Sequence, residues 1–306
     1  MTILVTGGAG FIGSHIVDKL IDKGYTVIIA DNLSAGNMHN VNPEAKFCKI
    51  DIRDPNLERI FQENTIDYVF HEAAQASVNK SIEDPYNDMT VNIMGSLNLF
   101  QLCKKYAVKK TIIASTAAVY GNPIYLPVDE KHSTEMLSFY GLSKFTMENY
   151  LKLLDIDYLI FRYSNVYGPR QDANGEAGVI SVFIDKILKK EPLEIHGTGK
   201  QTRDFIYVED IAAANILGLE TAIKNEVINV STNTHSNIIE LINILQNISR
   251  LEITTSFTKP REGDIEHSTL DNSKARDFLS WTNTVSLSQG LEKTLRWKET
   301  LMEKTY

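Results

Sequence analysis

The sequence predicts an α/β fold, namely a doubly wound parallel sheet with a smaller, interleaved α+β lobe. Two observations lead to this prediction. From the N-terminus to about residue 163, short apolar runs typical of buried parallel strands alternate with segments of helical apolar spacing. After residue 163 the chain becomes rich in Gly, Pro and Asn, and shorter elements follow. We therefore expect one domain over 1–165, to which residues around 205–232 return, and a second lobe mainly over 166–306.

The first expected strand, Thr2–Thr6, runs directly into a turn with glycine at positions 7, 8, 10 and 13. Helical apolar spacing begins at Phe11. A strand, a glycine turn and a helix N-terminus together form a binding site for a pyrophosphate. The spacing is G-x-x-G-x-x-G, not the G-x-G-x-x-G of simple dehydrogenases, and such glycines can also serve packing alone.

The second expected strand, Tyr25–Ala30, ends at Asp31. Its distance from the glycine turn is close to the ~20 residues expected for a carboxylate that hydrogen-bonds an adenosine ribose. Because a carboxylate there would repel a 2′-phosphate, the pattern favours NAD over NADP. The alternative is that Asp31 only begins a loop, where Asp and Asn are common. The combination of Asp31 with the glycine turn favours the interpretation that Asp31 binds a cofactor.

The remaining elements continue the alternation. A helix is expected after Asp54 and Pro55, which suit an N-cap and a first turn. Other strands are expected at 46–50, 67–71, 110–115, 156–163 and 226–230, the last as an addition to the first sheet, and helices at 85–106, 138–154, 179–189 and 208–219. Ligands of such sheets bind outside the carboxyl ends of the strands, where Asp31, Asp51 and the segments after His71 and Ser115 fall.

The composition of the 306 residues, with 43% hydrophobic and 23% charged, is that of an ordinary soluble globular protein. A net charge of −8 argues against nucleic-acid and anionic-membrane binding. No apolar run approaches the ~20 residues of a membrane helix, and the N-terminal run is too short for a signal peptide. Two distant cysteines, Cys48 and Cys103, suggest a reduced, cytoplasmic protein. The histidines show no ligand-like spacing, so we expect no metal.

Residues with catalytic chemistry follow the fifth expected strand. Thr116 lies at its carboxyl end, and Tyr140 and Lys144 come one loop later at a spacing that places both on one helix face. A free Tyr has a pKa of about 10, too high for a base at neutral pH. A nearby ammonium and a positive nicotinamide ring would favour the phenolate. Taken alone, a Tyr–Lys pair at this spacing usually marks only a helix surface.

These motifs together resemble the extended short-chain dehydrogenase/reductase family, most closely the UDP-glucose 4-epimerases and related nucleotide-sugar epimerases. The resemblance covers essentially the whole chain and rests on the glycine turn, S-T-A-A-V-Y-G, Y-x-x-x-K, R-Y-S-N-V-Y-G-P-R, T-R-D-F-I-Y-V-E-D and P-R-E-G-D. It implies a Rossmann domain with a bound NAD, a UDP-sugar substrate and 4-epimerisation through a transient 4-keto sugar. It also implies a homodimer formed by the 85–106 and 138–154 helices, whose apolar residues could equally be core.

The resemblance also assigns residue roles. Thr116, Tyr140 and Lys144 match the catalytic hydroxyl, base and lysine. The NAD contacts match Gly7, Gly10, Phe11, Ile12, Gly13, Asp31, Asn32, Asp51, Ile52, Ala73, Ala74, Gln75, Asn92, Tyr140 and Lys144. The UDP-sugar contacts match Thr116, Asn165, Val179, His196, Arg203, Arg261, Asp264 and Ser268. Some epimerases carry a lysine near Gln75-Ala76, and that contact is not transferred.

Other functions of this fold require residues that differ from those of this chain. Nucleotide-sugar dehydratases and decarboxylases need an extra acid or base where this chain has Ala117 and Ala118, which cannot move protons. A non-catalytic Rossmann protein that binds NAD or RNA would not need Tyr140 and Lys144 together, and a hydrolase would need a G-x-S-x-G elbow. Related enzymes include UDP-glucuronate 4-epimerases. Ser268 aligns where a bulky Tyr limits other pockets to plain hexoses, so UDP-GlcNAc and UDP-GalNAc are possible substrates beside UDP-glucose and UDP-galactose.

Overall fold

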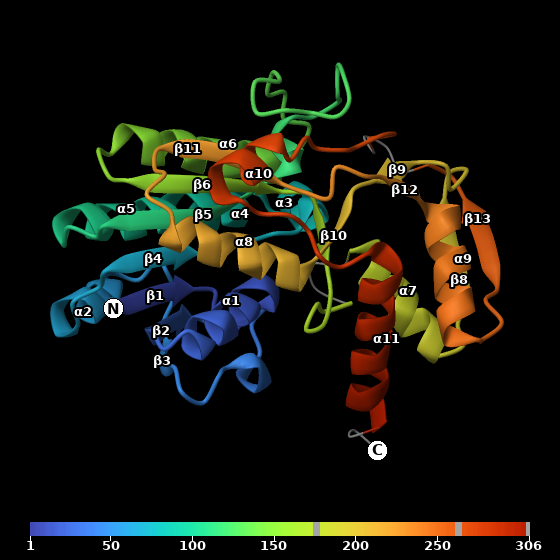
Figure 1. Cartoon of the computed structure of the whole chain (residues 1–306), viewed down its shortest axis with the longest axis horizontal. Coiled ribbons are helices and arrows are strands. Elements are labelled where there is room, and N and C mark those ends of the chain that lie inside the picture. The colour runs from blue at the N-terminus through green and yellow to red at the C-terminus, as the bar shows by residue number, and fades with distance from the viewer. Residues whose placement is uncertain (174–177, 261–264, 304–306) are drawn as a thin grey trace.

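The structure is a computed structural model of the whole chain and describes residues 1–173, 178–260 and 265–303. It has two lobes. A large lobe is built around a central sheet and holds the N-terminus, and a small lobe beside it carries the last helix (Figure 1). The predicted α/β class is confirmed, because the central sheet is parallel throughout and has helices on both faces.

The central sheet has seven strands in the order β11-β6-β5-β4-β1-β2-β3. The strands are β1 Thr2–Thr6, β2 Thr26–Asp31, β3 Lys46–Lys49, β4 Tyr68–His71, β5 Lys110–Thr116, β6 Tyr158–Tyr163 and β11 Glu226–Val230. The expected addition of 226–230 to the sheet is therefore correct. The order reverses at β1, which lies between β2 and β4, and a doubly wound sheet opens a crevice at the carboxyl ends of the strands at this point.

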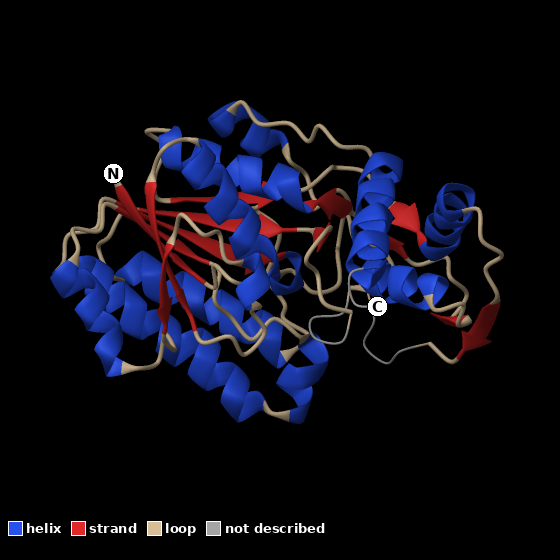
Figure 2. Cartoon of the chain, turned by 90° about the horizontal axis from the view of Figure 1, so that it is seen from below, coloured by secondary structure: helices blue, strands red, loops and turns tan. Residues whose placement is uncertain are grey.

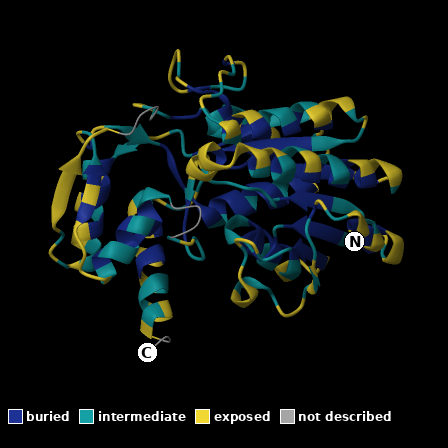
Figure 3. Cartoon of the chain, turned by 180° about the vertical axis from the view of Figure 1, so that it is seen from behind, coloured by how far each residue is buried: buried dark blue, intermediate teal, exposed yellow. Residues whose placement is uncertain are grey.

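Alternation along the strands decides which side chains cover which face. Ile3 and Val5 of β1 belong to the core cluster shared with α1 and α8, whereas Leu4 belongs to the cluster shared with α2 and α5. The helices on the first face are α1 Phe11–Asp22 and α8 Val208–Glu220; those on the second are α2 Glu58–Glu63, α5 Ser96–Lys105 and α6 Phe139–Leu153. The sheet therefore lies between two helical layers (Figure 2), and its inner strands are the most deeply buried part of the lobe, whereas the edge strand β3 is not buried (Figure 3).

The segment predicted as one helix over 85–106 is helical along its length but not uniform. It consists of α4 Pro85–Met89, a π-helical stretch η3 Thr90–Gly95 and then α5. A helix not predicted from the sequence, α3 Val78–Glu83, precedes it. The π stretch turns Asn92 and Gly95 into the interior, and a Cβ at Gly95 would lie only 2.7 Å from the Ile52 side chain. The wider turn thus brings the helix close to the loop after β3.

The small lobe has its own core, centred on α7, α9 and α11. Its elements are α7 Val179–Leu188, β8 Leu193–His196, α9 Ile238–Ser249, β13 Thr255–Thr258 and α11 Leu287–Glu303, with β8 parallel to β13. Between the lobes run β7 Asn165–Tyr167 paired with β10 Phe205–Tyr207, and β9 Thr202–Arg203 paired with β12 Ser236–Asn237. The remaining elements are α10 Ser273–Leu279 and the short turns η1 Met38–Asn40, η2 Pro55–Leu57 and η4 Ala117–Val119.

Candidate active site

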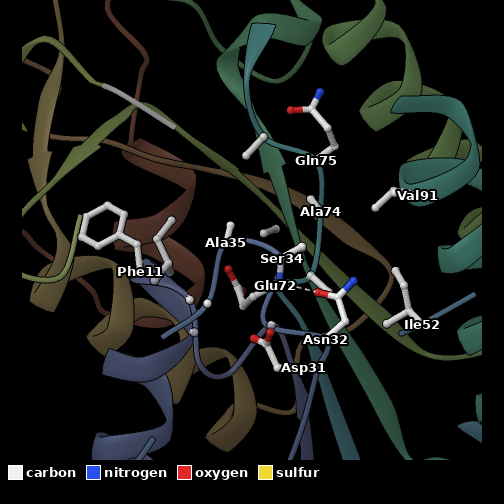
Figure 4. A pocket seen from close by; sticks show the side chains of 18 of the residues that line it. Phe11, Asp31, Asn32, Ser34, Ala35, Ile52, Glu72, Ala74, Gln75 and Val91 are labelled. Atoms are coloured by element: carbon white, nitrogen blue, oxygen red, sulfur yellow. Dashed lines mark hydrogen bonds between the residues drawn. The ribbon is translucent and has the colours of Figure 1, made fainter. Parts of the chain in front are cut away.

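A pocket of about 290 Å³ opens at the carboxyl ends of β1, β2, β4 and β5, and we call it the strand-end pocket. Of the residues predicted to bind a cofactor, all except Asn92 line it. In Figure 4, Phe11 lies on one side, Ile52 and Val91 on the other, and Asp31 and Asn32 below. The sheet topology therefore brings together residues that are widely separated in the sequence.

The glycine turn forms one wall of the strand-end pocket, and a side chain at Gly7 would not fit there. Gly7 has a φ of +71°, and a Cβ on it would lie 2.6 Å from the Ala73 backbone nitrogen. Gly10 is the N-cap of α1 and offers no side chain to the first turn, so the amide groups at the start of the helix are left available to a ligand. This arrangement suits a pyrophosphate at the N-terminus of α1.

Two carboxylates mark the end of the pocket near β2 and β3. Asp31 Oδ2 accepts a hydrogen bond from Ala9 N at 3.0 Å, and Oδ1 accepts one from Leu33 N at 2.8 Å. Burial raises the pKa of Asp31. Asp51 is held by Arg53 and Asn32, and its hydrogen bonds with Arg53 lower its pKa to about 2. Both carboxyls are thus fixed in place at this end of the pocket.

Asn92 supports the pocket from behind. Its Oδ1 accepts from Gln75 N at 2.8 Å, and its Nδ2 donates to Gln75 O at 2.9 Å. The same Nδ2 also contacts Ser143 Oγ at 3.0 Å, between Tyr140 and Lys144 on α6. Asn92 does not line the pocket itself; its side chain binds the loop that does.

Tyr140 and Lys144 both line the strand-end pocket, as their helical spacing suggested. Ser138 begins α6, and its hydroxyl accepts a hydrogen bond from Gly141 N. Lys144 is buried, and its Nζ donates to Ala114 O of β5 at 2.8 Å. The strand next to the helix thus fixes the ammonium in the pocket that Tyr140 also lines. Thr116 ends β5 and does not line the pocket; its Oγ1 accepts from Ala118 N at 3.2 Å.

The sequence analysis missed Glu72, which follows β4 and lines the same pocket. Burial raises the pKa of Glu72 to about 8, although the Lys144 ammonium acts in the opposite direction. The available signal was a charged residue placed directly after a buried strand, at the edge where ligands bind. A second missed group, Glu148, is fully buried and bound by Arg162 at 2.7 and 2.9 Å and by Ser115 at 2.5 Å.

Of the predicted substrate residues other than Thr116, those that the structure describes lie outside the strand-end pocket, between the lobes and in the small lobe: Asn165, Val179, His196, Arg203 and Ser268. Asn165 N donates to Asp204 O, next to Arg203, and Ser268 N donates to Thr202 O on the other side of Arg203. Asn165, Arg203 and Ser268 are therefore neighbours through short backbone contacts. Val179 begins α7, and His196 ends β8, where its Nδ1 lies 2.9 Å from Thr258 Oγ1. Arg261 and Asp264 lie outside the described residues.

Within the part of the chain that the structure describes, no cluster of three or more His, Cys, Asp or Glu side chains is placed to hold a metal ion. Among the helices of the described ranges, none has the length and apolar character to span a bilayer.

Comparisons with known proteins agree with the geometry. Residues 3–231 match the NAD dependent epimerase/dehydratase family. A Methanocaldococcus jannaschii relative, provisionally named UDP-glucose 4-epimerase, is 47% identical over 300 residues, covering 96% of this chain and 97% of the relative. The crystal structure of a Thermotoga maritima UDP-glucose 4-epimerase with UDP-glucose superposes with a TM-score of 0.96 at 43% identity and covers 99% and 100% of the two chains. A Methanobrevibacter ruminantium UDP-N-acetylglucosamine 4-epimerase in complex with UDP-N-acetylmuramic acid has a TM-score of 0.94 at 41% identity, covering 98% and 99%.

Proposed function

Because this chain belongs to the NAD-dependent epimerase/dehydratase family, we propose that it catalyses the reversible 4-epimerisation of a UDP-hexose, with UDP-glucose and UDP-galactose as its first substrate pair. The observation that carries the proposal is the Tyr140–Lys144 pair in one pocket with the glycine turn and Asp31. The reaction is redox-neutral overall, since the sugar is oxidised and then reduced at the same carbon.

NAD is the cofactor of this family, and the strand-end pocket fits it. Gly7, Gly10 and the N-terminus of α1 would hold the pyrophosphate, Asp31 the adenosine ribose, and Asp51 with Ile52 the base. The bound cofactor supplies a hydride acceptor and donor. The residues at the other end of the pocket, Tyr140 and Lys144, would manage the proton.

The proton steps follow from positions on α6 and β5. Tyr140 takes the proton from the sugar 4-hydroxyl while that carbon is oxidised, and returns it to O4 on reduction. Lys144, anchored on Ala114 O, places a positive charge beside the phenolate and stabilises it. Thr116 offers a hydroxyl that can hydrogen-bond the reacting oxygen. Ala117 and Ala118 follow in η4 and carry no acid or base, so elimination of water has no catalyst there.

The UDP part would be held by Arg203, since a guanidinium suits phosphate oxygens, together with Asn165, Val179 and His196. Arg261 and Asp264 complete the proposed set. Ser268 sits beside Arg203 through the Ser268 N–Thr202 O bond. Its small side chain would leave room for a 2-acetamido group, which extends the proposed substrates to UDP-GlcNAc and UDP-GalNAc.

A coupled assay over three substrate pairs tests the function. We expect the unsubstituted chain to turn over UDP-glucose and UDP-galactose, and also UDP-GlcNAc and UDP-GalNAc. Ser268→Tyr should abolish turnover of the N-acetylated pair, and Ser268→Ala should retain it. Unchanged turnover of N-acetylated sugars in Ser268→Tyr would refute the role of Ser268. If UDP-glucuronate is epimerised and the neutral hexoses are not, the runner-up function, UDP-glucuronate 4-epimerisation, replaces this one. Release of water from the sugar would instead identify a dehydratase.

We also propose a homodimer formed by α3, α4 and α6. These helices carry exposed apolar side chains that the chain alone does not cover: Val78, Ile82, Tyr86, Met89, Leu142 and Tyr150. A clustered apolar surface of this kind is typical of an interface. Sedimentation should give twice the chain mass, and Tyr86→Glu combined with Leu142→Glu should yield monomers. A monomeric wild-type protein at micromolar concentration would contradict this.

A further inference from the structure

We propose that Glu72 is a positioning residue whose ionisation sets how strongly the strand-end pocket prefers oxidised over reduced NAD. The inference rests on the proposed function in one respect, namely that NAD binds in this pocket. It goes beyond that function because it assigns a role to a carboxyl group outside the Thr116, Tyr140 and Lys144 set.

The backbone of Glu72 is fixed against the glycine turn. Glu72 N donates to Thr6 O at 3.1 Å, and a Cβ on Gly7 would lie 2.8 Å from the carbonyl carbon of Glu72. The side chain lines the strand-end pocket together with Tyr140 and Lys144. In Figure 4 it lies between Phe11 and Ile52, toward the middle of the pocket. The carboxyl group is therefore held close to any cofactor that the glycine turn binds.

The Glu72 carboxyl group has a hydrogen-bond partner but, among the described residues, no ion-pair partner. Tyr163 Oη lies 3.3 Å from Glu72 Oε1 and itself receives a hydrogen bond from Asn215 Nδ2 at 2.8 Å. The Tyr163 proton is thus directed at Glu72. Glu148, a fully buried glutamate, contrasts with the half-buried Glu72, because Arg162 binds both oxygens of Glu148. Among the described residues, no ion pair is formed by Glu72.

The charged and titratable groups around Glu72 come from four elements. Lys144 and Tyr140 face it from α6, Tyr163 from β6, His71 precedes it in β4, and Asp31 lies farther along the same pocket at the end of β2. Burial lowers the pKa of His71 to about 3, so His71 is neutral at physiological pH. Burial raises the pKa of Tyr163 well above its ordinary value, so Tyr163 is neutral as well.

Glu72 is consequently the carboxyl in this group that changes charge near neutrality, since burial raises its pKa to about 8. Oxidised nicotinamide carries a positive charge and reduced nicotinamide carries none. An ionised Glu72 therefore attracts the oxidised nicotinamide ring electrostatically and has no such attraction for the reduced ring. By linkage, binding of NAD⁺ lowers the pKa of Glu72 and releases protons near pH 8. The preference for NAD⁺ should therefore rise as the pH increases.

The test measures dissociation constants of NAD⁺ and NADH for the cofactor-free full chain between pH 6.5 and 9. Tyr140→Phe serves as the background, because it removes the titration of Tyr140. The ratio of the NADH constant to the NAD⁺ constant should rise about tenfold across this range, the effect of one pKa unit. Adding Glu72→Gln, which keeps the size and a hydrogen-bond acceptor for Tyr163, should make the ratio independent of pH.

A matched control is Glu130→Gln. Burial also raises the pKa of Glu130, but this residue binds Asn229 N at 2.7 Å and does not line the pocket. The control should leave the tenfold rise intact. Calorimetry in two buffers of different ionisation enthalpy should show proton release with NAD⁺ that is absent in Glu72→Gln. A ratio that still rises with pH in Glu72→Gln would overturn the inference while the proposed function stands. If neither form of NAD binds the unsubstituted chain, the proposed function fails first.

Discussion

The two halves of the candidate site are built in different ways. In the large lobe, the site residues follow the ends of neighbouring parallel strands or begin a helix, so the register of the sheet positions them. Toward the small lobe, Asn165 and Arg203 lie in strands of three and two residues, and Ser268 lies outside any strand. The packed central sheet therefore positions the residues on the cofactor side, whereas a few local hydrogen bonds position those on the substrate side.

Asp204 is the centre of those hydrogen bonds. Its Oδ1 accepts from Thr232 N at 2.9 Å, from Thr232 Oγ1 at 2.7 Å and from Ser164 Oγ at 3.3 Å, and its Oδ2 accepts from Leu270 N at 3.4 Å. One buried carboxyl thus joins the ends of β6 and β11 to the segment that carries Ser268. It is adjacent to Arg203, so it positions the residues predicted to hold the UDP.

The largest effect is expected on the cofactor side, from Tyr140→Phe. Removal of the phenolic hydroxyl should lower kcat about 10³-fold, because general acid–base catalysis contributes ~10²–10⁴. Binding of NAD and of UDP should stay within about twofold, since no packing is lost. Tyr125→Phe, at an exposed tyrosine outside the pocket and the proposed dimer surface, is the control and should leave kcat unchanged. Near-normal turnover by Tyr140→Phe would contradict the assignment.

A second prediction tests the contact between the lobes through pH. Burial raises the pKa of Asp204 to about 6 from its ordinary 3.8. The folded state therefore holds this proton more tightly, and ionisation costs stability as the pH rises from about 4 to 6, by at most ~3 kcal/mol. Asp204→Asn should remove that part of the slope of unfolding free energy against pH in urea titrations.

The exposed Asp277 of α10 provides the control, because Asp277→Asn should retain the slope of the unsubstituted chain. An equal slope in Asp204→Asn and in the unsubstituted chain would show that Asp204 does not titrate in this window. Reduced UDP affinity in Asp204→Asn, with NAD affinity unchanged, would separate the two halves of the site in one protein.

The sequence predicts which residues meet in the strand-end pocket because its signals are local. The glycine turn, Asp31 after the second strand and the spacing of Tyr140 and Lys144 each fix a relation between residues close in the chain. Parallel pairing then brings the strand ends together at one edge of the sheet. Element ends predicted from apolar runs differ from the structure by a few residues at most, as at β6.

Other features could not be predicted because they depend on distant contacts. The π stretch η3 occurs where Asn92 binds the Gln75 backbone from behind the pocket, and no periodicity in 85–106 encodes that partner. The environment of Glu72 requires knowing that Tyr163 and Lys144 approach it from two other elements. The meeting of Arg203 with the Ser268 segment depends on pairing across more than sixty residues of chain, as in the Ser268 N–Thr202 O bond.

A third prediction addresses the substrate side directly. Arg203→Met should raise KM for the UDP-sugar about 10- to 100-fold, the value of a charge-assisted hydrogen bond of ~1.5–3 kcal/mol, and leave NAD affinity unchanged. Arg203→Lys should recover part of the loss, because an ammonium keeps the charge but not the planar fork. Arg276→Met on the exposed side of α10 is the control. If the loss falls on kcat and KM stays constant, Arg203 does not hold the diphosphate.

The smallest effect is expected from Thr116→Ser, and it shows how far catalysis at the end of β5 depends on single atoms. Thr116 Oγ1 accepts from Ala118 N at 3.2 Å and begins η4, and a serine hydroxyl can do the same. Activity should therefore stay within about twofold, whereas Thr116→Val, with the same shape and no hydroxyl, should lose about 10²-fold. Equal losses in Ser and Val variants would mean that the methyl group and its packing matter, and the oxygen does not. Catalysis would then depend on the packing of the Thr116 methyl group at the end of β5.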